Sequence, residues 1–312
     1  MTDSFSSDSQ TGGYSASMKD ELDTLRAELT ELKAEHADLQ LLYEATIEHG
    51  EAVEDQLAEN NQLLLDTQRR LEAELADAGR YVLSILPEPR SEGPKADWLL
   101  VPSTELGGDS FGYHDLDSDH FAIYLIDVCG HGVGAALLSV SIINVLRSCA
   151  LPETDFRIPS DVLFKLNNAF PMERQNNMFF TIWYGVFQRS TGKLSYASGG
   201  HPAAVLLPAA AAKDEGAFSL IGTSEGMVIG AIEDMTFDQS DVLVRSGDRL
   251  LVLSDGTYEV DDLEGNVLSL EGLANAALAA NGSIPAHILE WVQKKSGQSE
   301  LPDDYSMIEF QF

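Results

Sequence analysis

The sequence predicts an α+β fold in which largely antiparallel sheets carry helices on their outer faces, preceded by a long coiled-coil helix. Two observations support this prediction. Apolar residues recur in heptads from Met18 to Leu71, which is the pattern of a coiled-coil seam. After Pro87 and Pro89, many strand patterns follow one another without helical crossovers, and such neighbours usually pair as antiparallel strands.

The predicted coiled coil has apolar side chains spaced alternately four and three residues apart. They are Met18, Leu22, Leu25, Leu29, Leu32, Leu39, Tyr43, Val53, Leu57, Leu64 and Leu71. His36, Gly50 and Asn60 interrupt this seam. A buried Asn at a seam position fixes the register of the helices, and Gly weakens a helix by about 1 kcal/mol relative to Ala. We expect a homodimer; the alternative is an amphipathic helix that lies against its own domain.

Three segments follow from these patterns. Residues 1–17 are polar and Ser-rich and are expected to form a disordered tail. Residues 18–79 are expected to form the dimerising coiled-coil helix, and residues 80–312 a separate α+β domain. The 17 residues before the helix are too few for a sensor domain. We therefore expect an upstream regulator to bind the coiled coil around residues 40–70.

The charge of the chain excludes some classes of partner. It carries 51 acidic and 19 basic residues, for a formal net charge of -32. Such a surface repels nucleic acids and anionic membranes, so neither is expected as a partner. Cys129 and Cys149 are too few for a disulfide framework. No apolar run reaches the roughly 18 residues of a membrane span. We expect a cytoplasmic protein.

Strand and helix patterns alternate irregularly after the coiled coil. Strands are predicted at residues 98–101, 120–126, 178–187, 193–197, 227–229, 249–253 and 305–312. Helices are predicted at residues 135–148, 161–170, 272–280 and 285–295, the second of them with Ser160 as its N-cap.

Aspartates stand at the ends of several predicted strands. Two of them follow a buried apolar run, and the others precede an extended segment. In chain order they are Asp109, Asp127, Asp255, Asp303 and Asp304. Because opposite ends of antiparallel neighbours lie on one edge of a sheet, we expect these carboxylates to converge.

Converging carboxylates repel one another unless a proton or a cation neutralises them. Oxygen-only ligands, without a Cys/His set at zinc spacing, favour Mg²⁺ or Mn²⁺. Two such ions about 3.5–4 Å apart can hold a water, lower its pKa and orient it for in-line attack on phosphorus. The glycine-rich turn at residues 130–134 exposes main-chain carbonyls for a metal and amides for an anion. The sequence therefore predicts a two-metal site that acts on a phosphate ester.

Six sequence blocks give residues 80–312 a specific resemblance. They are Glu105-Leu-Gly-Gly-Asp-Ser-Phe111, Ile126-Asp-Val-Cys-Gly-His-Gly-Val-Gly-Ala-Ala136, Met178-Phe-Phe-Thr181, Gly200-His-Pro202, Ser254-Asp-Gly256 and Asp303-Asp304-Tyr-Ser306. Their order resembles that in the bacterial SpoIIE-like (RsbU-type) PPM family of metal-dependent protein serine/threonine phosphatases. The resemblance implies a β-sandwich of two sheets flanked by helices, with two Mn²⁺ or Mg²⁺ ions. It also implies dephosphorylation of phosphoserine or phosphothreonine in a partner protein, such as an anti-sigma factor antagonist.

The resemblance also implies roles for individual residues. Asp127 would bridge both ions, and the main-chain carbonyl of Val128 would be a further ligand. The remaining ligands, direct or through water, would be Asp109, Asp255, Asp303 and, as an alternate, Asp304. We find no equivalent of the phosphate-binding arginine of the eukaryotic branch.

Two histidines and a cysteine lie near the proposed ligands in the sequence. His131 is interpreted as a turn residue or a hydrogen-bond partner more than as a general acid, and His201 as a structural loop residue. Cys129 lacks a positioned His partner for thiol chemistry.

A catalytically silent coiled-coil scaffold is the main alternative function. A catalytic site that has decayed usually loses ligands, whereas all the proposed acids are present in this sequence. A coiled-coil-linked nucleotide cyclase would need purine-recognition and phosphate-clamp residues, which we cannot identify.

Overall fold

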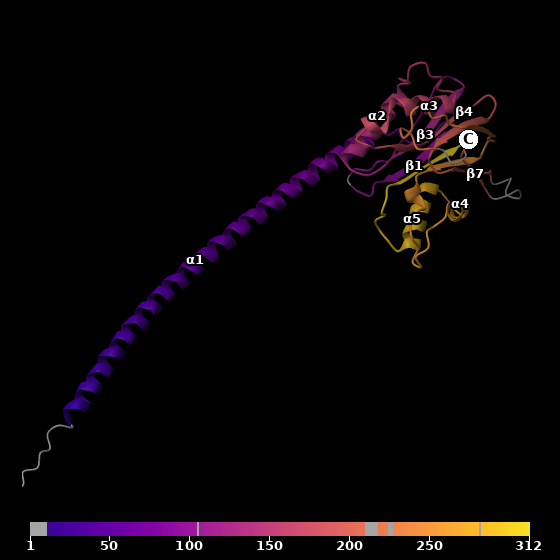
Figure 1. Ribbon diagram of the computed structural model, residues 1–312. Helices are drawn as coiled ribbons and strands as arrows, with labels where there is room; N and C mark the ends of the chain where they lie inside the picture. The colour runs from indigo at the N-terminus through magenta and orange to yellow at the C-terminus, as the bar shows by residue number, and fades with distance from the viewer. Residues whose placement is uncertain (1–10, 105, 210–217, 224–226, 281) are drawn as a thin grey trace, which may run out of the picture. The chain divides into compact units, whose positions relative to one another are not determined.

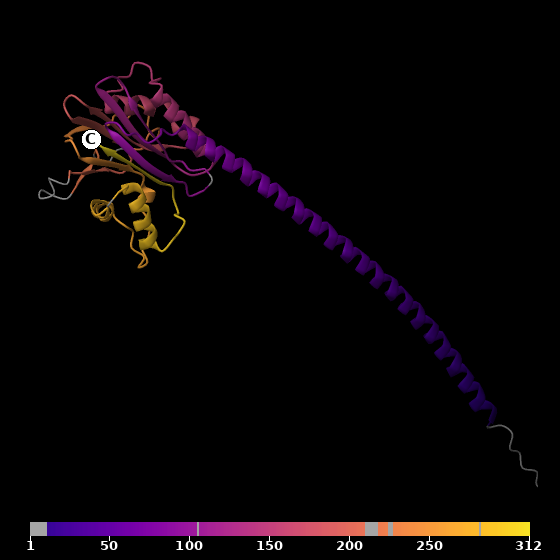
Figure 2. The same cartoon turned by 180° about the vertical axis from the view of Figure 1, so that it is seen from behind.

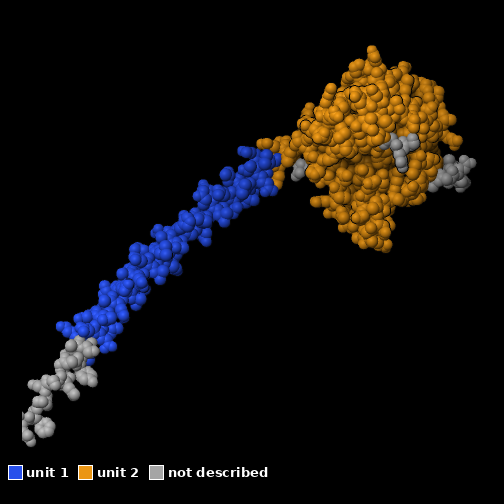
Figure 3. All heavy atoms as spheres, viewed as in Figure 1, with its two compact units in different colours: residues 1–71 blue, residues 72–312 orange. Residues whose placement is uncertain are grey.

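The computed structural model describes residues 11–104, 106–209, 218–223, 227–280 and 282–312. Glu105 and the first ten residues of the predicted tail lie outside the described residues. The chain forms two compact units, residues 1–71 and residues 72–312 (Figure 3). This boundary precedes the predicted one at residues 79 and 80, because the last turns of the long helix pack into the second unit. There, Ile85 contacts an apolar cluster and Leu86 is buried.

The long helix α1 (Thr11–Ile85) is continuous (Figure 1). It begins at Thr11, so residues 11–17 of the predicted tail are helical. Extending a nucleated helix costs little, because each added residue gains a hydrogen bond. The apolar seam is exposed along the first unit: Leu25 and Leu57 are both 59% exposed and Leu64 is 66% exposed.

The second unit contains two five-stranded antiparallel sheets. Sheet A has the order β1 (Lys95–Val101), β10 (Tyr305–Gln311), β9 (Arg249–Leu253), β6 (Ala204–Leu207), β7 (Ser219–Ile221). Sheet B has the order β2 (Ser110–Asp115), β3 (His120–Val128), β4 (Phe180–Gln188), β5 (Lys193–Gly199), β8 (Gln239–Leu243). The predicted antiparallel pairing is thus confirmed.

An apolar core lies between the sheets, and helices cover their outer faces. From β3, alternate residues such as Phe121 and Leu125 point between the sheets, where they join Val252 of β9 in one cluster. The intervening residues of β3 pack on α2 (Val133–Arg147) and α3 (Pro159–Ala169). Sheet A carries α4 (Leu270–Leu278) and α5 (Ile284–Ser296) on its other face. Both views show this division of the helices (Figures 1 and 2).

Two local predictions were wrong. Residues 227–229 form no strand; Ile229 makes only an isolated bridge to Phe180. The helix α3 begins at Pro159 with Ile158 as its N-cap, so Ser160 lies in the first turn. Proline suits this first position because its missing N–H would lack a partner there anyway. Among the described residues, no helix is long and apolar enough to cross a membrane.

Candidate metal centre

The predicted acids lie at one edge of the two sheets. In sheet B, Asp127 near the end of β3 is paired with Thr181 of β4. Ser110 at the start of β2 pairs with Ile126, so Asp109 lies beside Asp127 on the neighbouring chain segment. Because side chains alternate between the faces of a sheet, Asp127 shares the inward face of β3 with Leu125.

Sheet A brings its acids to the same edge. Asp255 opens the short 3₁₀ helix η3 (Asp255–Thr257), directly after β9 and Ser254. Asp303 and Asp304 precede β10, which is the neighbour of β9, and the Ser254 amide donates to the Ser306 carbonyl at 3.0 Å. Acids from four separate segments of the chain thus meet at one edge.

The charges of these acids affect one another. Burial, followed by the charges of Asp255, Asp303 and Asp304, raises the pKa of Asp127 to about 7. Burial and then the charge of Asp127 raise the pKa of Asp109 well above its usual value. The pKa of Asp255 is raised by burial and then by the charge of Asp303. A cation at this edge would relieve both causes.

The acids are electrostatic neighbours, but they do not form a closed ligand cage. Within the described part of the chain, no group of three or more His, Cys, Asp or Glu side chains is arranged to hold a metal ion. One reason is that the carboxylate of Asp304 already accepts hydrogen bonds from the protein at both oxygens. Its Oδ1 accepts hydrogen bonds from the amide and the hydroxyl of Ser103, at 2.8 and 3.0 Å. Its Oδ2 accepts from the amides of Gly108, at 2.8 Å, and Asp109, at 3.3 Å.

The donor atoms at this edge suit Mg²⁺ or Mn²⁺. In the described chain, Asp109 Oδ2 and the Ser306 hydroxyl oxygen are buried without a hydrogen bond of normal geometry, although the Ser306 hydroxyl lies close enough to Asp109 to oppose the rise in its pKa. An unpaired buried carboxylate oxygen is costly, and ligation of a hard cation would satisfy it. The carbonyl oxygen of Val128 lies against Gly108, where a side chain would clash with it. Side-chain and main-chain oxygens together would therefore provide the ligands of such a cation.

The turn after Asp127 is built on glycines. Gly130 and Gly132 have φ of 86° and 87°, a conformation that residues with a side chain rarely adopt. The Gly132 amide donates to the Leu106 carbonyl at 2.9 Å, which ties this turn to the loop that carries Asp109. His131, between the two glycines, is exposed. The Phe179 amide donates to Cys129 Sγ at 3.2 Å, so this thiol has a main-chain partner.

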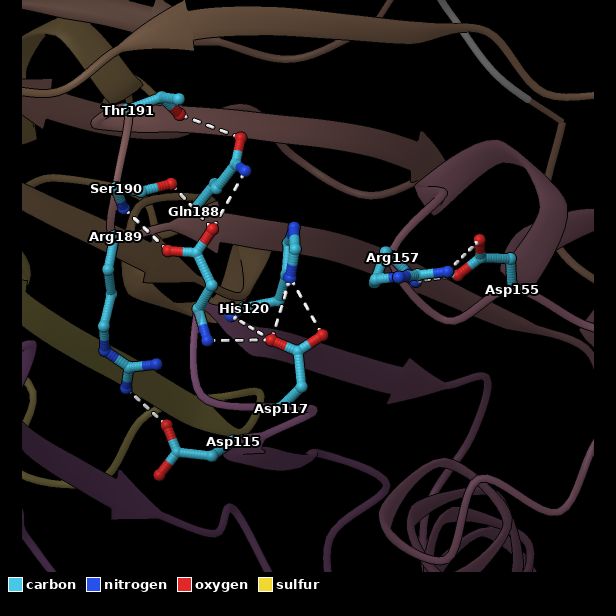
Figure 4. Close-up of polar contacts among 10 residues, drawn as sticks. Asp115, Asp117, His120, Asp155, Arg157, Gln188, Arg189, Ser190 and Thr191 are labelled. Atoms are coloured by element: carbon cyan, nitrogen blue, oxygen red, sulfur yellow. Dashed lines mark hydrogen bonds and ion pairs between the residues drawn. The ribbon is translucent and has the colours of Figure 1, made fainter.

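The opposite end of sheet B also carries acids, but hydrogen bonds and an arginine side chain stabilise their charged forms (Figure 4). Asp119 accepts from the Ser190 amide at 2.7 Å, the Ser190 hydroxyl at 2.6 Å and Gln188 at 3.0 Å. Hydrogen bonds from Ser190 and Gln188 hold the pKa of Asp119 below its usual value. Arg189 forms an ion pair with Asp115. The two ends of one sheet thus differ, and only the first has carboxylates with raised pKa values among the described residues.

A buried histidine also lies at the edge that carries the Asp109–Asp127 pair. His201, interpreted as a structural loop residue, is buried and contacts both Thr181 and the Leu253 carbonyl. The Gly-His-Pro block was the signal, but it carries no information about these partners.

Comparisons with known proteins agree with this arrangement. A model of the family described as stage II sporulation protein E (SpoIIE) matches residues 117–312. Phosphoserine phosphatase RsbU of Bacillus subtilis is 28% identical over 223 residues, which cover 71% of this chain and 62% of RsbU. Phosphoserine phosphatase RsbP of the same organism is 27% identical over 200 residues, covering 64% of this chain and 47% of RsbP. The chain thus spans less than two thirds of either relative.

Solved structures show the same fold. The SiaA PP2C domain of Pseudomonas aeruginosa matches with a TM-score of 0.66 at 18% identity, covering 79% of this chain and 98% of that one. The PP2C phosphatase domain of SpoIIE from Bacillus subtilis, with a fragment of its regulatory domain, matches with a TM-score of 0.58 at 16% identity. That match covers 70% of this chain and 62% of the other. The predicted PPM-type sandwich of two sheets flanked by helices is confirmed, and the chain belongs to the SpoIIE family.

Proposed function

We propose that this chain is a Mn²⁺- or Mg²⁺-dependent protein serine/threonine phosphatase. The observation that carries the proposal is the edge where Asp109, Asp127 and Asp255 have raised pKa values and Asp109 Oδ2 is buried without a partner. Membership of the SpoIIE family supports it, as do the names of RsbU and RsbP as phosphoserine phosphatases. The solved structure of RsbX, another neighbour in fold, is a complex with magnesium.

Specific residues would hold two ions at this edge. They are Asp127, Asp109, Asp255, Asp303 and the carbonyl of Val128. The bound ions would supply Lewis-acid activation of a water and charge stabilisation of the phosphoryl group. Asp304, whose two oxygens already accept main-chain hydrogen bonds, would instead hold the loop before β2. This assignment makes Asp303 the direct ligand of the adjacent pair.

The acid edge also explains why such a phosphatase would need metal. A phosphate monoester is anionic, and the five acids at the edge would repel it in their charged form. Two divalent cations bound there would offset most of this negative charge and would place positive charge next to the phosphate. The same argument opposes the silent scaffold, which would have no reason to keep buried carboxylates with costly charged forms.

The substrate would be a phosphoserine or phosphothreonine in a partner protein, and an anti-sigma factor antagonist is our specific proposal. The family resemblance supports this choice, because it implies a phosphorylated antagonist of this kind as the substrate. The acidity of the whole chain argues against nucleic acid as a substrate.

The first unit would assemble the protein as a homodimer and control it. The exposed leucines of the seam support dimerisation, because an isolated helix gains nothing from a one-sided apolar stripe in water. We propose that a regulator binds around residues 40–70. Within the second unit, Gly79 and Leu83 of α1 line a small cavity together with Gly107 and Asp109. A shift of this part of the helix would therefore reach the loop that carries Asp109.

Hydrolysis of para-nitrophenyl phosphate and of a phosphoserine peptide tests the activity. We expect both reactions to require Mn²⁺ or Mg²⁺ and to stop when the ions are chelated. Binding of Mn²⁺ without any hydrolysis would favour the scaffold, and release of pyrophosphate from a nucleoside triphosphate would favour the cyclase.

A further inference from the structure

The Gly200-His201-Pro202 block lies where the chain passes from one sheet to the other. It follows β5 of sheet B and precedes β6 of sheet A. Gly200 forms a parallel bridge to Ile182 of β4, which holds the crossing against sheet B. The main chain of His201 is fixed by Ser198, whose hydroxyl donates to the His201 carbonyl at 2.8 Å and accepts from its amide at 3.2 Å.

The ring of His201 makes one hydrogen bond to each sheet. Its Nδ1 lies 2.7 Å from the hydroxyl oxygen of Thr181 on β4, and its Nε2 lies 3.1 Å from the carbonyl oxygen of Leu253 on β9. A carbonyl can only accept, so Nε2 carries the proton and Nδ1 accepts from the Thr181 hydroxyl. Burial lowers the pKa of His201 to about 3, which keeps the ring neutral at neutral pH.

The two partners of the ring are the neighbours of two acids. Thr181 pairs directly with Asp127 in the register of β3 and β4. Leu253 is the last residue of β9, and Asp255 opens the 3₁₀ helix that follows. The path Asp127–Thr181–His201–Leu253–Asp255 therefore connects an acid of sheet B with an acid of sheet A through the Thr181 hydroxyl and the His201 ring.

We propose that His201 is a positioning residue that sets the spacing between Asp127 and Asp255 by linking the two sheets at the acid edge. This inference rests on the proposed function, because the spacing matters only if the two acids share bound ions. The charge of Asp255 acts on Asp127, so the two acids repel and tend to separate the sheet edges. A neutral ring resists this separation without adding a charge of its own.

Proton transfer is the competing role for His201. Both ring nitrogens already have partners inside the protein, and the residue is 7% exposed. A general acid must reach the leaving group of the substrate. The contacts of His201 direct both nitrogens to the protein instead.

Calorimetric titration of the full chain with Mn²⁺ tests the proposal without relying on activity. Thr181→Val removes the hydroxyl and keeps the shape of the side chain, and His201→Leu removes both hydrogen bonds. Each change should weaken Mn²⁺ binding about tenfold, the size expected for losing one or two buried hydrogen bonds. The double variant should bind no more weakly than the weaker single variant, since both changes break the same link. His201→Gln keeps a donor for the Leu253 carbonyl and should recover part of the affinity.

A matched control separates positioning from general stability. Tyr184→Phe removes a buried hydrogen bond of 2.9 Å to the Phe156 carbonyl, also from β4 but on the face covered by helices. It should lower the Tm and leave Mn²⁺ affinity unchanged. Wild-type affinity in Thr181→Val, the mildest change, would overturn the proposal even if His201→Leu does not fold. If the wild-type chain neither binds Mn²⁺ nor hydrolyses para-nitrophenyl phosphate, the proposed function itself fails.

Discussion

The carboxylate of Asp304 accepts a hydrogen bond of 2.8 Å from the amide of Gly108, and it thereby holds the loop that presents Asp109. A side chain at Gly107 would clash with the same carboxylate, so the loop can approach Asp304 only because residue 107 is a glycine. Two adjacent acids before β10 therefore differ in their surroundings. Asp304 is buried against main-chain amides, whereas Asp303 is exposed and adds its charge to that of Asp127 and Asp255.

Substitution of these two acids should give opposite results. In Asp304→Asn, an NH₂ group replaces one of the two oxygens that accept hydrogen bonds, and an NH₂ group cannot accept them. The metal-free protein should therefore lose about 1–3 kcal/mol of its free energy of unfolding. Asp303→Asn should leave that free energy nearly unchanged and abolish most Mn²⁺ affinity. Urea unfolding with a chelator present and calorimetric titration measure the two quantities. Equal stability of Asp304→Asn and wild type, with normal Mn²⁺ binding by Asp303→Asn, would reverse the assignment.

Asp127→Asn should abolish Mn²⁺-dependent hydrolysis while the chain stays folded, because a neutral amide cannot replace a bridging carboxylate. Burial and neighbouring charges already disfavour ionised Asp127, so the metal-free variant should melt at or above the temperature of the wild type. Added Mn²⁺ should raise the Tm of the wild type through linkage, and not that of the variant.

Asp119→Asn provides the control for this comparison. It should lower the Tm by weakening the contacts with Ser190 and Gln188, and it should keep the Mn²⁺-induced shift. Turnover of Asp127→Asn near the wild-type rate, at saturating Mn²⁺, would remove the central ligand from the proposal.

The full chain should be a dimer at micromolar concentration, whereas residues 80–312 alone should be a monomer or a weak dimer. Light scattering distinguishes these states. If the helices are parallel and in register, Asn60→Cys should form a disulfide between the two chains on oxidation. Glu59→Cys, one position off the seam, should cross-link far less, and wild type gives the background from its two native cysteines. A monomeric full chain would contradict the dimer.

Replacing Gly50 and Asn60 with Leu should lock the seam and raise the phosphatase rate of the isolated protein severalfold. The physical reason is that an imperfect seam repacks at little cost, so the unmodified helix populates more than one arrangement. Steady-state kinetics and Mn²⁺ affinity provide the measurements, with Glu59→Ala as the control off the seam. If the locked variant and a chain lacking residues 1–79 both match the wild type, the coiled coil is a passive tether.

His114 should make the metal-free protein less stable in mild acid. Burial lowers its pKa from 6.5, and its Nε2 has no hydrogen-bond partner among the described residues. As the pH falls below about 6.5, the unfolded chain takes up a proton before the folded chain does, so the free energy of unfolding decreases. Urea unfolding of wild type and His114→Gln across this range should show a steeper decrease in the wild type. Parallel curves would show that His114 does not contribute.

Several elements were predictable because their signals are local. The run Arg249–Leu253 was predicted with the bounds that β9 has, since a buried strand between polar residues is recognisable by itself. The strand β8 was not predicted, because Gln239–Leu243 is largely polar and exposed and pairs only at the edge of sheet B. The apparent strand at residues 227–229 failed for the opposite reason: it has strand-like residues but only one bridging neighbour.

The sequence by itself determined the heptad pattern of the long helix, the buried strands and the presence of acids at strand ends. All three depend on residues that are close together in the chain, where spacing and side-chain type decide the outcome. Only the tertiary structure decided that Asp304 faces the Gly108 amide, 196 positions away, and that His201 reaches the Leu253 carbonyl, 52 positions away. Two adjacent aspartates are chemically identical in a sequence. They become different when the packing of two sheets surrounds one with amide donors and leaves the other exposed among charges.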